Sequence, residues 1–294
     1  MTKALVLSGG GSVGIAWQTG LAAGLARHGV DLAGADFIVG TSAGSSVGAQ
    51  LALGNDLEER LGSYERSIGG PGDAERPNPT PDPSMAERMA RFMTMMAELI
   101  DALPEVRRSA IGRFALEADA LPEDTFVAMF SFLKDAVWPD RYACTAVDAE
   151  SGEFVAWDAR SSVPLDRAVA SSCAVPGLFA PITIGGRRYM DGGMRSGTNA
   201  DLAVGHDRVL VISLMTGARA ASADPRMARL FQTMDGELKV LADAGASVEI
   251  LGPDKGATDV MGLNLMDASI APRAALEGAR QGEEMASQLG RFWG

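Results

Sequence analysis

A chain of 294 residues with 47% apolar and 22% charged residues can bury a large core and has the composition of an ordinary globular protein. The formal net charge of −12 argues against broad nucleic-acid binding and against simple electrostatic attraction to anionic membranes. No apolar run approaches the ~18 residues of a membrane-spanning helix and no secretory signal is visible, so we expect a cytoplasmic protein, peripheral to a membrane at most.

The only two cysteines, Cys144 and Cys173, lie in apolar segments. In a chain without an export signal, buried reduced thiols are expected rather than a disulfide, and this spacing matches no metal site. The sequence implies neither a metal nor an organic cofactor.

The first predicted unit is a strand at residues 4–8, a glycine-rich turn and a helix that ends near His28. The turn Gly9–Gly14 has the spacing Gly-x-Gly-x-x-Gly, which suits either a dinucleotide pyrophosphate or the oxyanion of an acyl-transfer intermediate. A dinucleotide site needs an acidic residue at the end of the second strand, which residues 39–42 do not supply. The oxyanion interpretation is therefore favoured, with a dinucleotide site or a plain tight turn as alternatives.

A nucleophile elbow is predicted where an apolar strand, residues 37–39, meets a small-residue helix, residues 45–53. The connecting sequence is Gly-x-Ser-x-Gly, in which Gly40 and Gly44 let the strand and the helix approach without a Cβ clash. The Ser42 hydroxyl would then stand at the carboxyl edge of a sheet, above the positive end of the helix. The alternative is a Ser/Gly turn without catalytic function, because five-residue matches of this kind arise by chance.

Residues 68–137 differ in character from the rest of the chain. Proline and glycine are dense at residues 69–83, which predicts a linker, and helices are expected at residues 84–103 and 124–136. We interpret the whole segment as a mostly helical insertion. Its methionine-rich first helix is expected to pack on the core, with a lid over an acyl-binding groove or a lipid-contact surface as alternatives.

Strand and helix alternation then resumes, and the apolar run at residues 208–214 suits a parallel strand buried on both faces. Further strands are expected at residues 141–147, 154–157, 182–184, 187–190 and 248–251, and helices at residues 164–173, 199–204, 225–244 and 272–292. The sequence Asp191-Gly192-Gly193 directly follows one of these strands, which predicts an exposed carboxylate in a flexible turn or a simple turn-former.

A serine nucleophile needs a general base, and the chain contains only two histidines. His28 closes the first helix and should lie far from the carboxyl edge of the sheet. His206 follows Ser42 and Asp191 in the order found in α/β-hydrolases, but it precedes strand 208–214 and so should lie at the opposite edge. A Ser-Asp-His triad is therefore an alternative, and Asp191 is the best-placed direct base.

The glycine-rich loop, the elbow, the Asp191 turn and the block Ala170–Pro181 together resemble the patatin-like phospholipase family. The likeness extends over most of the chain and is weakest in the helical insertion. It implies that Ser42 is the nucleophile, that Asp191 is the base, and that the glycine-rich loop forms the oxyanion hole.

The resemblance places the oxyanion hole at Gly9, Gly10 and Gly11, with Ala43 beside them. One position departs from the family pattern, because the loop commonly carries arginine or lysine where this chain has Val13. A cation there could strengthen the field at the oxyanion or bind an anionic headgroup. The departure therefore leaves the headgroup preference open.

We predict a single domain over residues 1–294 with a three-layer α/β/α sandwich and a mainly parallel sheet. The expected activity is hydrolysis of carboxylic esters of lipids, with an acyl lipid or another ester as the partner molecule and no nucleic acid. Because a carboxylate base ionises at lower pH than histidine, we expect activity to persist below the pH at which a histidine-dependent enzyme fades. A non-catalytic relative that binds acyl lipids or proteins is the alternative from another class.

Overall fold

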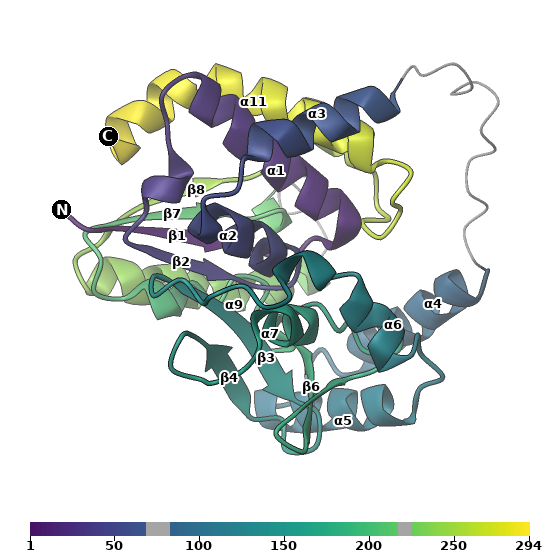
Figure 1. The fold of residues 1–294 in the computed structure, drawn as a ribbon. Helices are drawn as coiled ribbons and strands as arrows, with labels where there is room; N and C mark the ends of the chain where they lie inside the picture. Colours follow the sequence, from purple (N-terminus) through teal and green to yellow (C-terminus); the bar gives the residue numbers. More distant parts are fainter. Residues whose placement is uncertain (69–82, 217–224) are drawn as a thin grey trace.

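The computed structural model describes residues 1–68, 83–216 and 225–294 (Figure 1). Nearly all of the predicted linker at residues 69–83 lies outside the described residues. Among the described residues, no helix combines the length and the apolar character needed to cross a membrane.

The centre of the fold is a mixed sheet of eight strands with helices on both faces, so the predicted α/β architecture is confirmed. Strands β8, β7, β1, β2 and β3 pair in parallel, whereas β3 pairs antiparallel with β4 and β6, and β6 pairs antiparallel with β5. The strands are β1 (Lys3–Leu7), β2 (Phe37–Gly40), β3 (Tyr142–Asp148), β4 (Phe154–Trp157), β5 (Ile182–Ile184), β6 (Arg187–Asp191), β7 (Arg208–Ile212) and β8 (Ser247–Leu251).

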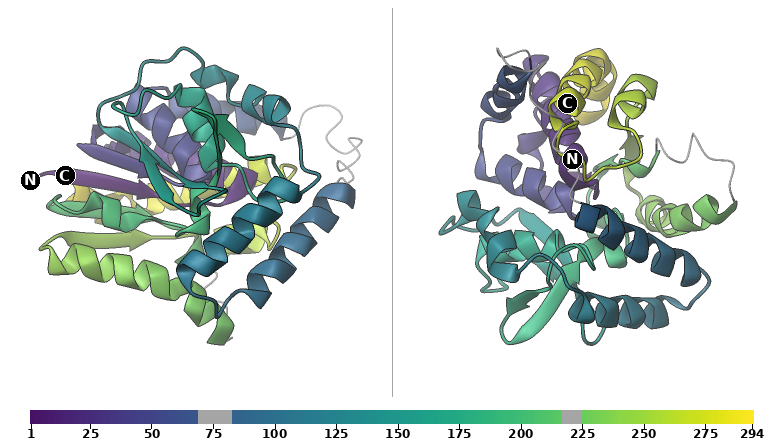
Figure 2. Two further views of the ribbon diagram at one scale, coloured as in Figure 1. Left: turned by 90° about the horizontal axis from the view of Figure 1, so that it is seen from below. Right: turned by 90° about the vertical axis from the view of Figure 1, so that its right-hand side faces the viewer.

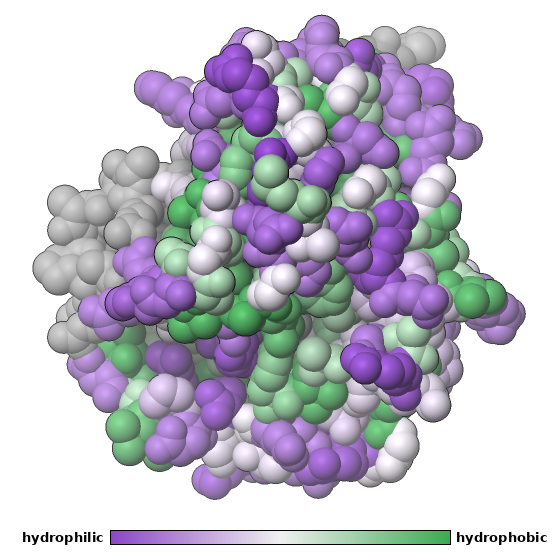
Figure 3. Space-filling view, turned by 90° about the vertical axis from the view of Figure 1, so that its left-hand side faces the viewer, coloured by the Kyte–Doolittle hydropathy of each residue, from purple (hydrophilic) through white to green (hydrophobic). Residues whose placement is uncertain are grey.

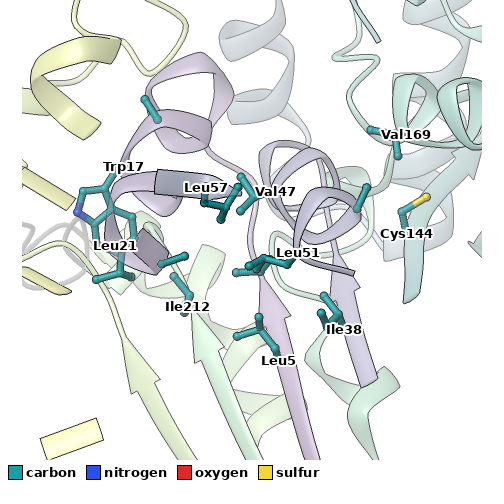
Figure 4. Close-up of a cluster of buried hydrophobic side chains, with 14 of the residues drawn as sticks. Leu5, Trp17, Leu21, Ile38, Val47, Leu51, Leu57, Cys144, Val169 and Ile212 are labelled. Atoms are coloured by element: carbon teal, nitrogen blue, oxygen red, sulfur yellow. The ribbon is translucent and has the colours of Figure 1, made fainter. Parts of the chain in front are cut away.

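The central strands are apolar on both faces because each face is covered by helices. In β1, Leu5 and Leu7 belong to the larger core cluster, whereas Ala4 and Val6 belong to a second cluster on the other face. Figure 4 shows the larger cluster, in which side chains of the helices above the sheet contact those of the strands. Its labelled members are Leu5, Trp17, Leu21, Ile38, Val47, Leu51, Leu57, Cys144, Val169 and Ile212.

One face of the sheet carries helices from both ends of the chain, and α9 lies on the other (Figure 1). The helices are α1 (Gly11–Arg27), α2 (Ala43–Leu53), α3 (Leu57–Ser67), α4 (Pro83–Glu98), α5 (Pro104–Glu117), α6 (Glu123–Ala128), α7 (Leu165–Ser172), α9 (Pro225–Asp243), α10 (Lys255–Met261) and α11 (Ala271–Trp293). Two 3-10 helices near the site are η3 (Gly192–Met194) and η4 (Ala200–Ala203).

Helices α3, α5 and α10 were not expected from the sequence. Helix α3 is rich in charged residues and buries only Leu57 and Leu61, so it carries too few apolar positions for a clear helical period. In α5 only Ile111, Gly112 and Ala115 are buried, among mostly polar neighbours. The local signal in α3 and α10 lies at their first turns, where the side chains of Asp56 and Asp254 accept hydrogen bonds from backbone N–H groups.

The described part of the predicted insertion is helical. Helices α4 and α5 lie side by side in both views of Figure 2. They contribute Phe92, Ile111 and Ala115 to a third apolar cluster, which also contains Val147 of β3 and Met190 of β6. This packing on the core agrees with the favoured interpretation of the methionine-rich helix.

The two chain termini lie on the side of the molecule where β1 begins (Figure 1). Figure 3 shows this side, where many hydrophilic residues surround an apolar band. The carboxyl ends of the parallel strands, which carry the candidate site, lie at the opposite edge of the sheet.

Candidate active site

The turn between β2 and α2 has the backbone geometry of a nucleophile elbow. Ser42 caps α2 with φ 52° and ψ −120°, a conformation that L residues rarely adopt and that costs on the order of 1–3 kcal/mol. A Cβ on Gly40 would lie 2.3 Å from the Gly44 carbonyl oxygen, and one on Gly44 would lie 2.1 Å from the Leu7 carbonyl oxygen. Both glycines are therefore required for the close approach of strand and helix.

Side chains from α2 and from the end of α7 hold the Ser42 backbone in this conformation. The Ser42 N–H donates to Ser172 Oγ at 3.0 Å. The Ser42 carbonyl accepts from Ser45 Oγ at 2.6 Å and from Cys173 Sγ at 3.1 Å. Sequence reasoning placed Ser172 and Cys173 only in a block that resembles the family, whereas the structure gives them a contact with the elbow.

Strands β2 and β6 meet end to end beside β3, and this topology brings Ser42 to Asp191. Strand β4 pairs with residues 144–147 of β3, so it occupies one edge of β3 over that span. On the other edge, Gly40 of β2 is opposite Cys144 and Asp191 of β6 is opposite Ala146. The carboxyl ends of the two strands therefore point at each other, about two residues apart along β3.

The Asp191 carboxyl group lies in this junction, 2% exposed. Its Oδ1 accepts a hydrogen bond from the Gly193 N–H at 2.7 Å, and the Ser42 side chain lies close enough to stabilise its charged form. Desolvation raises the Asp191 pKa from 3.8 to about 7, although the Gly193 N–H and the Ser42 side chain oppose the shift. This shift argues against the expectation that activity persists well below the histidine range, because burial moves the pKa of this carboxylate toward that range.

The glycine-rich loop lies directly against the nucleophile, with a Cβ on Gly9 falling 3.3 Å from the Ser42 Cβ. Gly9 itself donates its N–H to the Gly197 carbonyl at 3.0 Å, so it cannot also donate to an oxyanion. Within the described parts of the chain, the N–H groups of Gly10, Gly11 and Ala43 have no acceptor. These three groups lie at the positive ends of α1 and α2, where an anion is stabilised.

Both histidines lie away from this junction. His206 precedes β7 and stacks on Phe37, the first residue of β2, with ring centroids 5.5 Å apart. Ser42 follows the other end of β2, five residues further along, which is ~16 Å of extended chain. His28 is exposed at the carboxyl end of α1. The arrangement therefore provides no histidine for a Ser-Asp-His triad.

Asn199 connects the two segments that carry the candidate dyad, and sequence reasoning missed it. Its Nδ2 group lies 2.9 Å from the Oγ1 of Thr41, the residue before Ser42, and 3.4 Å from the carbonyl of Gly192, the residue after Asp191. Asn199 is fully buried. Its φ of 51° is the left-handed conformation that asparagine tolerates better than most residues.

Glu237 of α9 binds the residues on either side of Asn199. It lies on the face of the sheet opposite to α1 and α11. Its Oε2 accepts from Thr198 Oγ1 at 2.6 Å and from the Ala200 N–H at 2.9 Å. Burial raises the pKa of this carboxyl group above its ordinary value. No sequence motif marked this residue, because only the tertiary fold brings α9 to the loop.

An apolar cavity of about 190 Å³ opens beside the nucleophile. Gly11, Ser42 and Ala43 are among its lining residues, so the candidate nucleophile and two of the three candidate oxyanion donors border the cavity. Most of the remaining wall is apolar and aromatic, with contributions from Phe126, Phe130, Phe132 and Phe179. A cavity of this kind suits an acyl chain attached to an ester carbonyl.

Val13, where the family pattern commonly has a basic residue, does not line this cavity. It is fully buried in the core, and its N–H donates to the Leu265 carbonyl at 3.0 Å. The loop is therefore held by backbone and apolar contacts at this position.

Comparison with known sequences identifies the family of this chain. The sequence profile of the patatin-like phospholipase family matches residues 5–204, about two thirds of the chain. The chain therefore belongs to the patatin-like phospholipase family.

Curated relatives include uncharacterized NTE family proteins of Mycobacterium bovis and Mycobacterium tuberculosis, each 29% identical over 209 residues. The alignments cover 68% of this chain and 47% of each relative, so the chain spans about half the length of these proteins. Among solved structures, VipD from Legionella pneumophila matches 98% of this chain and 67% of its own, at 12% identity and a TM-score of 0.41. The type III effector protein ExoU matches 96% of this chain and 53% of its own, at 18% identity and a TM-score of 0.37.

Proposed function

We propose that this chain is a serine acyl hydrolase that cleaves carboxylic esters of lipids through a Ser42–Asp191 dyad. The observation that carries the proposal is the position of the Ser42 side chain beside the buried Asp191 carboxyl group, where it stabilises the charged carboxylate, next to an apolar cavity. Family membership supports the same reaction class.

In the proposed reaction, Ser42 Oγ attacks the ester carbonyl while the Asp191 carboxylate accepts its proton. The N–H groups of Gly10, Gly11 and Ala43 stabilise the tetrahedral oxyanion. Asp191 then returns the proton to the departing alcohol, which leaves an acyl group on Ser42. A water molecule, deprotonated by Asp191, attacks this acyl-enzyme. Asp191 then returns the proton to Ser42 Oγ as the carboxylic acid leaves.

Hydrolysis of p-nitrophenyl esters of increasing chain length tests the proposal. We expect Ser42→Ala to lose activity to background and Asp191→Asn to lose ~10²–10⁴-fold in kcat, the usual contribution of a general base. Ser287→Ala and Asp243→Asn, both at exposed positions, are matched controls that should retain activity.

Three other outcomes would separate the alternatives. Loss in Ser42→Ala alone would mean that another group is the base. Retained activity in a folded Ser42→Ala variant would contradict the proposal. No turnover of any ester by the wild type, with acyl ligands still bound, would favour a binding-only relative.

A further inference from the structure

Arg60 contributes a positively charged side chain to the wall of the mainly apolar cavity beside Ser42. It comes from α3, a helix that the sequence did not predict, and lines the same cavity as Ser42. Its guanidinium carbon lies 5.8 Å from the centroid of the Phe132 ring, close enough for a cation–π contact.

The hydrogen-bonding capacity of Arg60 is only partly used. One Nη group donates to Gln50 Oε1 at 3.2 Å. The Nε atom is buried and has no acceptor among the residues that the structure describes. By contrast, Arg27 on the facing helix α1 makes ion pairs with Glu58, Glu65 and Glu283.

Arg60 has no ion pair with any carboxylate of residues 1–68, 83–216 or 225–294, although acidic residues outnumber basic ones, 38 to 26, in the whole sequence. A partly desolvated cation without an anionic partner is unfavourable. A guanidinium group in an apolar wall therefore favours a ligand that carries its own carboxylate or phosphate.

The position of Arg60 relative to Ser42 follows from α2. Ser42, Ser46 and Gln50 are spaced by four residues, so they lie along one side of this helix. Ser46 also lines the cavity, and Gln50 contacts Arg60. Eight residues of helix rise ~12 Å, so the Arg60 contact lies about that far along the helix from the nucleophile.

We propose that Arg60 binds an anionic group of the substrate, so that the preferred esters carry a carboxylate or phosphate on the order of 10 Å from the scissile carbonyl. The proposal rests on the proposed ester hydrolysis and specifies its substrate class. The anion could be a carboxylate at the far end of the acyl chain or a phosphate on the alcohol. Arg60 would thus supply, from α3, the positive charge that the loop lacks at Val13.

Two matched substrate pairs distinguish these sources. The first pair is p-nitrophenyl octanoate and the mono-p-nitrophenyl ester of octanedioic acid, which adds a terminal carboxylate. The second pair is 1-octanoylglycerol and its 3-phosphate. We expect the wild type to prefer the anionic member of one pair, and the pair that shows the preference identifies the source.

The variants Arg60→Met, Arg60→Lys and the exposed control Arg66→Met on the same helix test the assignment. Arg60→Met should lower the ratio of kcat/KM for the anionic ester to that for its neutral counterpart by about 10- to 100-fold, as expected for a hydrogen-bonded charge. Arg60→Lys should keep part of the preference, and Arg66→Met should keep all of it. An anionic-to-neutral ratio that is unchanged in Arg60→Met for both pairs would overturn the proposal.

A binding measurement separates this proposal from the proposed hydrolysis. Calorimetric titration of Ser42→Ala with octanedioate, octyl phosphate and octanol requires no turnover. We expect one of the anions to bind at least 10-fold more tightly than octanol, and the double variant with Arg60→Met to lose that difference. Equal binding in both backgrounds would overturn the role of Arg60 even if ester hydrolysis is established.

Discussion

At the residue scale, Ser42 and Asp191 both occupy unfavourable states that the surrounding structure maintains. Ser42 has a backbone conformation that its neighbours hold by hydrogen bonds to both its N–H and its carbonyl. Asp191 is a carboxyl group removed from water, and its pKa is raised to about 7. Strained backbone and shifted pKa values are typical of catalytic sites, although structural networks also produce them.

The raised pKa of Asp191 has a consequence for stability. Between pH 3.8, its ordinary pKa, and about 7, the folded chain retains a proton that the unfolded chain releases. Stability therefore falls as the pH rises through this window, and the full penalty, on the order of 4 kcal/mol, applies above it. The neutral variant Asp191→Asn avoids this penalty.

We expect Asp191→Asn to raise the melting temperature at pH 8 and to change it little at pH 4, measured by scanning calorimetry. The exposed control Asp243→Asn should show no comparable dependence on pH. An Asp191→Asn variant that is less stable than the wild type at pH 8 would contradict a charged, desolvated carboxylate.

At the element scale, the site depends on how strands and helices meet rather than on any single motif. The end-to-end arrangement of β2 and β6 beside β3 brings together residues almost 150 positions apart in the chain. Asn199 connects these two strand ends through Thr41 and Gly192. We infer that Asn199 is a positioning residue for the dyad.

Replacing Asn199 with glycine keeps the left-handed backbone accessible but removes the Nδ2 donor. We expect kcat to fall by about 10- to 100-fold with KM nearly unchanged, because small misplacements of reacting groups are costly. Steady-state kinetics on one ester, with Asn55→Gly at an exposed position as the control, provides the measurement. A rise in KM at constant kcat would instead indicate a role in substrate binding.

Helices α1 and α11 approach closely through glycines on both sides of their contact. A Cβ on Gly278 of α11 would lie 2.2 Å from the carbonyl oxygen of Trp17 in α1, and one on Gly24 would lie 2.2 Å from that of Ala279. Because α1 begins at the candidate oxyanion loop, the spacing of these helices also affects the site.

Gly278→Ala should therefore destabilise the chain by about 1–3 kcal/mol, since the added methyl group must push two backbones apart. Gly236 of α9 provides a matched control, because within the described residues nothing lies within 4 Å of its Cβ position. Gly236→Ala should instead stabilise the helix by roughly 0.5–1 kcal/mol. Urea unfolding of both variants measures the difference, and equal effects would contradict the close-packing argument.

At the scale of the whole molecule, the sequence predicted best the turns whose residue types and spacing are themselves characteristic. The Gly9–Gly14 loop, the elbow and the Asp191 turn each have their residues at fixed spacing. The alternation of strands and helices then indicated a sheet that brings such turns to one edge. The family resemblance, which the profile match confirms, rested on the same three turns and on the block Ala170–Pro181.

Features created by tertiary packing were not predictable in this way. Arg60 lies on a helix with a weak apolar pattern, and Asn199 follows no recognised motif. The raised pKa of Asp191 depends on its burial between β3, β6 and the elbow, which no local spacing encodes. Peripheral membrane contact stays a prediction from the sequence.

Reaction with a fluorophosphonate, followed by peptide mass spectrometry, tests the central claim most directly because it needs no knowledge of the substrate. We predict a single phosphonylated serine, Ser42, with a labelling rate that falls as the pH is lowered through about 7 and that drops at least 100-fold in Asp191→Asn at pH 8. Labelling of another serine, or of Ser42 at a rate that Asp191→Asn does not change, would contradict the dyad.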